Sequence, residues 1–450
     1  MPYEVTDDIF FKNFISSKQN LSESSKKNYK KTLKKFCKAN TTTLEDIITN
    51  CRNQQDKIIE KTTHTGTDNQ GNQIVEKTIT KFNPNNIESY IKLYLDTYNN
   101  YCKGIGNKNT TINQDLLLIR SFLKYYDITL PTYEKLEDDT AKWHLLSKED
   151  FKFIMQDSTI LHASLIKFLI STGMRLQDAL SLSIRDYMEA TQEYHTYTDV
   201  NDFIDNAPND MIGSWYFNPN KTRRYNIQCQ TFNDPESNNL ILQNLRKIKN
   251  EYLPRLNKLN GTNLELNKDD ALFASQKSNY KGHITSQSIT NRFALKNKKL
   301  QEHHINMIKQ EIKDGKISKE DYDKEVAKIP RFHAHACRKY FETMIARNCG
   351  NLRLCTLLEG HVSPVATDSS YIKLDFMEVK EAYMAAIPDL SLENTDVKVY
   401  TSDVRREMEQ KISSLEKELE EKEEKVSNIE KRLAGVDDIL ARLDKLEQNK

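Results

Sequence analysis

The clearest hydrophobic pattern in the chain lies near its C-terminal end, where apolar residues recur at alternating intervals of three and four. These residues are Met408, Ile412, Leu415, Leu419, Val426, Ile429, Leu433, Val436, Leu440 and Leu443. Only Lys422 interrupts the series. One helix with charged outer faces cannot bury such a stripe, so we predict a coiled coil over residues 404–447. It would self-associate or bind a protein partner through residues 408–443. A single helix folding back on its own domain is the alternative.

Helical periodicity also covers most of residues 1–130. Ser22 stands where an N-cap belongs, before a lysine-rich segment with an apolar stripe. The stripe consists of Tyr29, Leu33 and Phe36. Helical spacing returns over 86–128, whereas residues 61–85 are rich in Thr, Asn, Gln and Gly and alternate in IVEKTITKF. We therefore predict an all-α domain of four or five helices, with a β-hairpin inserted at 61–85.

A linker at 131–146 precedes a second domain at 147–392. The segment from Ser147 to Asp150 has the pattern of a capping box, and the apolar runs that follow predict successive helices. GSWYFNPNKTRRYNIQCQTF contains two apolar runs around a turn, which predicts a β-hairpin with a lysine near its tip. A charged helical insertion is expected at about 300–329. The fold class is therefore mainly α with a small β-sheet, an α+β domain.

Composition narrows the class of protein. Of 450 residues, 37% are hydrophobic and 29% charged. There is no run of eighteen apolar residues, so we expect no membrane span, and the start, MPYEVTDDIFFKNF, lacks the features of a signal peptide. The seven cysteines include no CxxC pair, which argues for a reducing compartment and against a disulfide framework or a zinc site. We expect a cytoplasmic protein, associated with the nucleoid in a prokaryotic host.

The net charge of +1 hides an uneven distribution. Residues 401–450 hold 14 acidic and 11 basic side chains, whereas the segment 26–38 holds seven lysines and no acid. Lysines three and four apart on a helix repel one another, and a DNA backbone would relieve that repulsion. A solvated helix is the alternative. The candidates for DNA contact are Lys26, Lys27, Lys30, Lys31 and Lys34.

Candidate chemistry gathers in the second domain. His335 and Arg338 are three residues apart, on one face of a predicted helix, and are followed by His361 and Tyr371. Arg175 lies much earlier, in STGMRLQDALSL. Guanidinium groups bind phosphate oxygens bidentately, imidazoles move protons near neutral pH, and a tyrosine oxygen can attack phosphorus. Together these side chains are what phosphoryl transfer without a metal requires.

The order TGMR, HxxR, GH and Tyr resembles the catalytic domain of tyrosine recombinases, the integrase family. The resemblance covers roughly residues 145–390 and, more loosely, 5–130, where the lysine-rich helix resembles the first helix of a core-binding domain. It implies that two domains clamp duplex DNA. It also implies that Tyr371 attacks a phosphodiester to give a 3′-phosphotyrosine and a free 5′ hydroxyl. Because the ester conserves the bond energy, no cofactor, metal or ATP is required.

The resemblance assigns the remaining roles. Arg175 and Arg338 would bind the non-bridging phosphate oxygens, and His335 and His361 would orient groups or move protons. Lys221, on the predicted hairpin, would protonate the leaving 5′ hydroxyl.

Alternatives remain open for two of these residues. Arg223 or Arg224 could take the role of Lys221. Asp178 corresponds to an acid that orients Arg175 from behind, although a plain surface ion pair with Arg175 is the alternative.

The chain departs from the family pattern at several points. Cys337 and Lys339 stand where Leu and His are common beside the arginine, and Glu359 replaces the leucine of Leu-Gly-His. The interval from the histidine to Tyr371 is one residue longer than usual. Tyr383 is a rival nucleophile, but its position within a predicted helix favours packing.

We therefore predict a site-specific recombinase or integrase that acts on attachment sites in double-stranded DNA, forms a tetramer there, and is encoded by a virus or mobile element. A DNA invertase or resolvase of the same family and a type IB topoisomerase are the alternatives with the same chemistry. A catalytically idle DNA-binding protein, or an assembly protein built around the coiled coil, is the alternative from another class.

Overall fold

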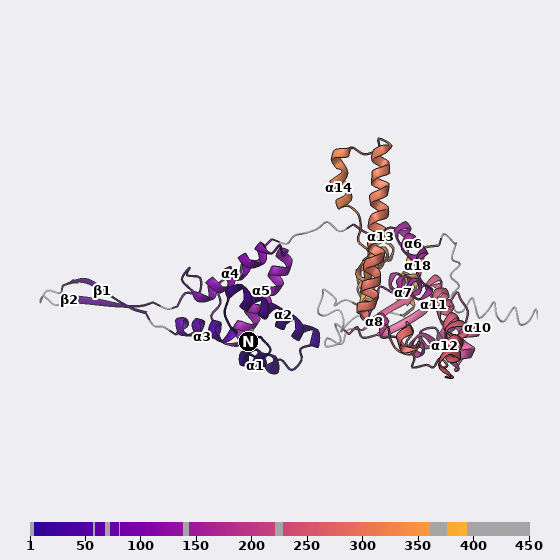
Figure 1. The fold of residues 1–450 in the computed structure, drawn as a ribbon, viewed down its shortest axis with the longest axis horizontal. Coiled ribbons are helices and arrows are strands. Elements are labelled where there is room, and N and C mark those ends of the chain that lie inside the picture. Colours follow the sequence, from indigo (N-terminus) through magenta and orange to yellow (C-terminus); the bar gives the residue numbers. More distant parts are fainter. Residues whose placement is uncertain are drawn as a thin grey trace, which may run out of the picture. The chain divides into compact units, whose positions relative to one another are not determined.

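The structure is a computed structural model. It describes residues 4–56, 59–67, 73–80, 82–137, 144–220, 228–360 and 376–393. The chain divides into two units, Met1–Lys142 and Trp143–Lys450, shown in Figure 1. Several predicted features lie outside the described residues: the coiled coil at 404–447, Lys221, Arg223, Arg224, His361 and Tyr371. No helix among the described residues is long and apolar enough to cross a membrane.

Unit 1 is helical apart from one hairpin. Its helices are α1 (Ile9–Ser17), α2 (Glu23–Asn40), α3 (Leu44–Gln55), α4 (Tyr90–Gly104) and α5 (Asn109–Tyr125). Strands β1 (Ile59–Thr67) and β2 (Gln73–Thr80) pair antiparallel between α3 and α4, with Ile59 opposite Thr80 and a bulge between His64 and Gly66 (Figure 1). The hairpin thus lies in the segment where the alternating pattern predicted one.

Helix α2 carries the lysine-rich segment. The Ser22 hydroxyl accepts a hydrogen bond from the Ser25 N–H, as an N-cap does. Tyr29, Leu33 and Phe36 are buried in the core of unit 1, which confirms the apolar stripe. Helix α1 precedes it and buries Phe11 and Phe14, so the lysine-rich helix is the second helix of unit 1.

Unit 2 is mainly helical with a small two-stranded sheet, as predicted. Its α-helices are α6 (Lys148–Gln156), α7 (Ile160–Thr172), α8 (Leu176–Leu180), α9 (Ile184–Ala190), α10 (Val200–Asn206), α11 (Pro235–Lys247), α12 (Leu253–Asn260), α13 (Ser286–Lys313), α14 (Tyr322–Ala327), α15 (Ala334–Cys349), α16 (Leu352–Glu359) and α18 (Phe376–Leu390). Short 3₁₀ segments lie at Gln192–Tyr194, Gln276–Ser278 and Lys319–Asp321, and a π-helical turn, Ile248–Tyr252, joins α11 to α12.

Strands β3 (Gly213–Phe217) and β4 (Cys229–Asn233) form the sheet, with Gly213 opposite Asn233 and Phe217 opposite Cys229. This antiparallel pair confirms the predicted hairpin. The capping box at the start of α6 is confirmed as well. The insertion expected at about 300–329 does not begin at a new helix, because α13 runs unbroken from Ser286 to Lys313 before α14 folds back beside it (Figure 1).

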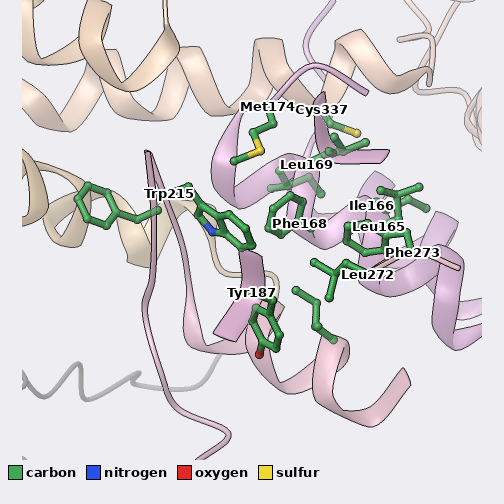
Figure 2. Close-up of a cluster of buried hydrophobic side chains, with 14 of the residues drawn as sticks. Leu165, Ile166, Phe168, Leu169, Met174, Tyr187, Trp215, Leu272, Phe273 and Cys337 are labelled. Atoms are coloured by element: carbon green, nitrogen blue, oxygen red, sulfur yellow. The ribbon is translucent and has the colours of Figure 1, made fainter. Parts of the chain in front are cut away.

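Helix α7 is the centre of unit 2. Its sequence, ILHASLIKFLIST, is apolar on nearly all sides, as expected of a helix buried all round, and every residue from Ala163 to Thr172 is buried. Figure 2 shows Phe168 beside Trp215 of β3, with Met174 and Cys337 close to the same cluster. The Phe168 and Trp215 rings meet edge to face, with centroids 5.2 Å apart. The buried position of α7 therefore fixes where residues 173–175, which follow it, leave the core.

A buried ionic cluster connects α7 to the end of α18. The Lys167 ammonium is fully buried, forms an ion pair with Asp234, lies 3.0 Å from Glu236, and donates to the Leu390 carbonyl at 2.9 Å. Glu236 in turn accepts a hydrogen bond of 2.8 Å from the Leu392 N–H. Because the amine has carboxylate and carbonyl partners, its burial is compensated.

Replacing Lys167 with Met should lower the free energy of unfolding by about 3–5 kcal/mol, because it leaves two carboxylates buried without their cation. Urea unfolding followed by tryptophan fluorescence measures this, since Trp215 is buried in the core of unit 2. Lys249→Met is the matched control. Its ion pair with Asp205 is partly exposed and should contribute about 0–1 kcal/mol. Equal effects of the two changes would contradict the assigned role of Lys167.

Candidate active site

A left-handed glycine turn delivers Arg175. Helix α7 ends at Gly173, whose φ of 63° favours glycine, and a Cβ there would lie 2.2 Å from the Phe341 ring. Met174 is then buried, and Arg175 becomes the N-cap residue of α8, half-buried. The turn therefore holds the backbone of Arg175 at a fixed place at the edge of the core.

Arg338 is a buried cation that joins three parts of the unit. It lies in the second turn of α15 and is 4% exposed. Its Nη1 donates to the Gly173 carbonyl at 2.7 Å, its Nη2 donates to the Glu359 carbonyl, and its Nε lies 2.8 Å from a Glu342 carboxylate oxygen. The two carbonyls belong to the C-terminal ends of α7 and α16, where the helix dipole favours a cation.

A second left-handed glycine turn, at the end of α16, lies against strand β4. Gly360 ends α16 with φ 60°, and a Cβ there would lie 2.9 Å from both Cβ and Sγ of Cys229. The same Cβ would be 3.3 Å from Pro219. The segment that contains His361 therefore begins directly after a residue that packs against Cys229 of β4 and against Pro219, which follows β3.

Asp178 connects α8 to the segment that follows β3. This buried carboxylate accepts a hydrogen bond of 3.0 Å from the N–H of Asn220, the residue before Lys221. Among the described residues no salt bridge joins Asp178 to Arg175, so the surface ion pair considered above is absent.

Burial and nearby charged groups shift the pKa of Arg175. Burial lowers the pKa of Arg175, the nearby Arg338 lowers it further, and Asp178 raises it. The two guanidinium groups thus lie close enough to repel each other. An anion between them would relieve this repulsion, and phosphate oxygens match the geometry of guanidinium donors.

His335 lies at the start of α15 and is exposed, unlike Arg338. Its ring lies nearly parallel to that of His333, the N-cap residue, with centroids 6.3 Å apart. Burial lowers the pKa of His333, and His335 and Lys339 lower it further. An imidazole pair therefore lies at the first turn of the helix that carries Arg338.

Two glutamates flank Arg338. Glu342 follows it by one helical turn on α15, and Glu359 is the last residue of α16. Burial raises the pKa of the Glu359 carboxyl to about 7; the charge of Glu342 raises it further and that of Arg338 lowers it. Glu359 therefore titrates in the physiological range.

In unit 1, the candidate lysines of α2 differ in their partners. Lys26 pairs with Glu23 and Lys34 with Glu4, each at 2.7 Å, so acids do lie near these two. Lys27, Lys30 and Lys31 are exposed and have no ion pair among the residues that the structure describes. Since they are spaced three and four apart, they lie on neighbouring positions of one face.

Of the predicted set, Arg338 contacts the Gly173 carbonyl, two residues before Arg175, and Asp178 contacts the residue before Lys221. Sequence reasoning missed Glu342, His333 and Cys229. The interval of four between Arg338 and Glu342 could have indicated an ion pair, whereas nothing in the sequence places Cys229 beside Gly360. Among the described residues, no three His, Cys, Asp or Glu side chains gather as metal ligands would.

No protein-family model matches the chain, and no curated protein sequence does. Solved structures do match it. They are structures of DNA integrases and recombinases. One match is the integrase of transposon Tn1549 in complex with transposon right end DNA, which is 14% identical in sequence. The aligned region covers 84% of this chain and 98% of the integrase chain, with a TM-score of 0.43.

Two further structures extend the comparison. XerA recombinase is 15% identical, with 83% of this chain and 95% of its own covered, at a TM-score of 0.26. A lambda integrase dimer bound to a core site is 10% identical, with 82% and 98% covered, at a TM-score of 0.39.

Replacing Glu359 with Gln should stabilise the protein at high pH but not at low pH. Because its pKa is raised above that of the unfolded chain, the folded state binds more protons between about pH 4.5 and 7, and wild-type stability falls as pH rises through this window. The unfolding midpoint of Glu359→Gln should therefore exceed that of wild type at about pH 8, and the difference should shrink at about pH 5. Thermal unfolding at both pH values measures this; a difference independent of pH would contradict the shifted titration.

Proposed function

We propose that this protein is a site-specific DNA recombinase of the tyrosine type, which cleaves and exchanges strands through a 3′-phosphotyrosine. The observation that carries the proposal is the convergence on one cluster. Arg338 donates to the Gly173 carbonyl, two residues before Arg175. Asp178 accepts a hydrogen bond from the residue before Lys221, and the glycine before His361 lies against Cys229 and Pro219. These contacts support a site that includes both arginines and the segments leading to Lys221 and His361.

Arg175 and Arg338 would bind the non-bridging oxygens of the scissile phosphate. A pair of guanidinium groups stabilises the charge that develops as phosphorus gains a fifth oxygen. Arg338 is held at three atoms by protein partners, so little reorganisation is needed when the phosphate arrives. His335 and His361 would orient the phosphate or move protons, and Lys221 would protonate the leaving 5′ hydroxyl.

Tyr371 is the proposed nucleophile. The described residues on either side of 361–375 both contact strand β4: Gly360 lies against Cys229, and the Phe376 ring lies 5.9 Å from that of Phe232. Tyr383, the rival, is fully buried in α18, and burial raises its pKa well above the usual value. A buried phenol of high pKa is a poor nucleophile, so Tyr383 packs the core.

Duplex DNA is the proposed partner, and Lys27, Lys30 and Lys31 of α2 would contact its backbone. The heptad pattern of residues 408–443 supports self-association, and strand exchange between two sites needs several subunits. We propose a tetramer on DNA and an origin in a virus or mobile element.

The nucleophile is tested with nicked duplexes built from the DNA that flanks the gene, run on denaturing gels. A covalent protein–DNA band should form with wild type and with Tyr383→Phe, and should be absent with Tyr371→Phe, because that variant lacks the attacking oxygen. Tyr383→Phe is the matched control, since it removes a hydroxyl from the same region.

Other outcomes separate the alternatives. A band that persists in Tyr371→Phe and vanishes in Tyr383→Phe would reverse the assignment. Tight binding without a band on any substrate would indicate an idle DNA-binding protein. Relaxation of supercoiled plasmid without strand exchange would indicate a topoisomerase.

The lysine face is tested by salt dependence. Replacing Lys27, Lys30 and Lys31 together with Ala should weaken DNA binding and reduce the slope of log K against log salt by roughly 3, because each phosphate contact releases about 0.9 counterion. Lys103→Ala with Lys108→Ala, two exposed lysines of unit 1 outside α2, is the control and should leave the slope nearly unchanged. Fluorescence anisotropy at several salt concentrations measures both. An unchanged slope in the triple variant would exclude this face.

A further inference from the structure

Helix α13 holds the chain that leads into α15. The Asn297 Oδ1 accepts a hydrogen bond of 2.7 Å from the Phe332 N–H, and the Gln301 Nε2 donates to the Pro330 carbonyl at 2.6 Å. The two amides are one helical turn apart on the same face of α13. Phe293, one turn earlier on that face, packs its ring against Phe332, with centroids 4.8 Å apart. Three side chains of one helix thus contact one short segment.

This segment, residues 330–332, connects the charged insertion to the helix that carries Arg338. His333, the N-cap residue of α15, directly follows it, and the His333 carbonyl accepts a hydrogen bond of 2.8 Å from the Ala336 N–H. His335 lies in the turn that this bond closes. The backbone of residues 330–332 therefore sets the direction in which the first turn of α15, with both imidazoles, begins.

Apolar packing alone would not fix that direction. Phe332 is buried against the rings of Phe293 and Phe151, and hydrophobic contacts of this kind are not directional. A backbone N–H and a carbonyl, by contrast, need partners that lie along defined directions. The partners here leave no choice of amide orientation, because only an oxygen accepts from an N–H and only an NH₂ group donates to a carbonyl. The two amides therefore add the directional constraint that the rings lack.

We propose that Asn297 and Gln301 are positioning residues for the imidazole of His335: they hold the backbone before α15 so that this ring reaches the phosphate bound by Arg338 and Arg175. This inference rests on the function proposed above. Neither amide touches DNA or the reacting atoms. Their effect passes through the backbone of α15 and belongs to the rate of cleavage, since a misplacement of about 1 Å in a catalytic group can cost on the order of 10²-fold in rate.

The experiment separates the rate of cleavage from DNA affinity, with the full chain and a fluorescent nicked duplex from the DNA that flanks the gene. Asn297→Leu removes the acceptor, and Gln301→Glu removes the donor at neutral pH. Each should slow covalent complex formation at saturating protein by about 10- to 100-fold. The dissociation constant, measured by anisotropy with Tyr371→Phe added to prevent cleavage, should stay close to that of the parent, because phosphate contacts dominate affinity.

A matched substitution distinguishes hydrogen bonding from charge. The carboxylate of Asn297→Asp still accepts from the Phe332 N–H, so this variant should cleave at nearly the wild-type rate. Gln301→Glu adds the same charge one turn away but cannot donate to the Pro330 carbonyl. The two variants also carry the test should Asn297→Leu fold poorly by circular dichroism. Asn306→Leu, at an exposed position of α13, is the control and should leave the rate unchanged.

The two proposals fail in different ways. If wild type forms the covalent complex and both Asn297→Leu and Gln301→Glu form it equally fast, the positioning role is wrong and the recombinase proposal stands. A loss of DNA affinity or helix content that accounts for the slower rate would reduce the amides to supports of the fold. If Asn297→Asp is as slow as Gln301→Glu, charge and not hydrogen bonding is responsible. If wild type forms no covalent complex with any flanking DNA, both proposals fall.

Discussion

The buried charge of Arg338 is the constraint on which the rest of unit 2 depends. Removing a guanidinium from water costs several kcal/mol unless protein groups replace its hydration. Here they are the carbonyls at the ends of α7 and α16 and the Glu342 carboxylate. Two helices must therefore end beside α15, and both end in left-handed glycine turns. The chain that leaves those turns continues to Arg175 and to His361, so one cation determines where the other candidate groups begin.

The buried packing around α7 makes this arrangement specific. Gly173 cannot carry a side chain because Phe341 of α15 fills the space, and Lys167 connects α7 to the end of α18. Helix α7 is thus held both by the helix that carries Arg338 and by the helix that follows the proposed nucleophile. Stability and site geometry share the same contacts, so substitutions at Gly173 or Lys167 would affect both.

Much of this could be predicted from the sequence, and the reasons for the rest are physical. Periodicity and capping residues located α2, α6 and α7, and the interval from His335 to Arg338 placed both on one helix. These are local features. The sequence did not show that α13 continues through residue 300 as one helix, because charged side chains on an exposed helix leave little apolar periodicity. The contact between Cys229 and Gly360 joins residues far apart in sequence, which no local pattern reports.

Glu359 combines a feature that is visible in the local sequence with one that depends on a contact between helices. Its departure from the Leu-Gly-His pattern is visible in the sequence, but its meaning depends on Glu342, which approaches only because α15 and α16 pack together. Burial raises the pKa of the Glu359 carboxyl, and the charge of Glu342 raises it further. The packing of two helices, rather than the local sequence, therefore sets the titration of this residue.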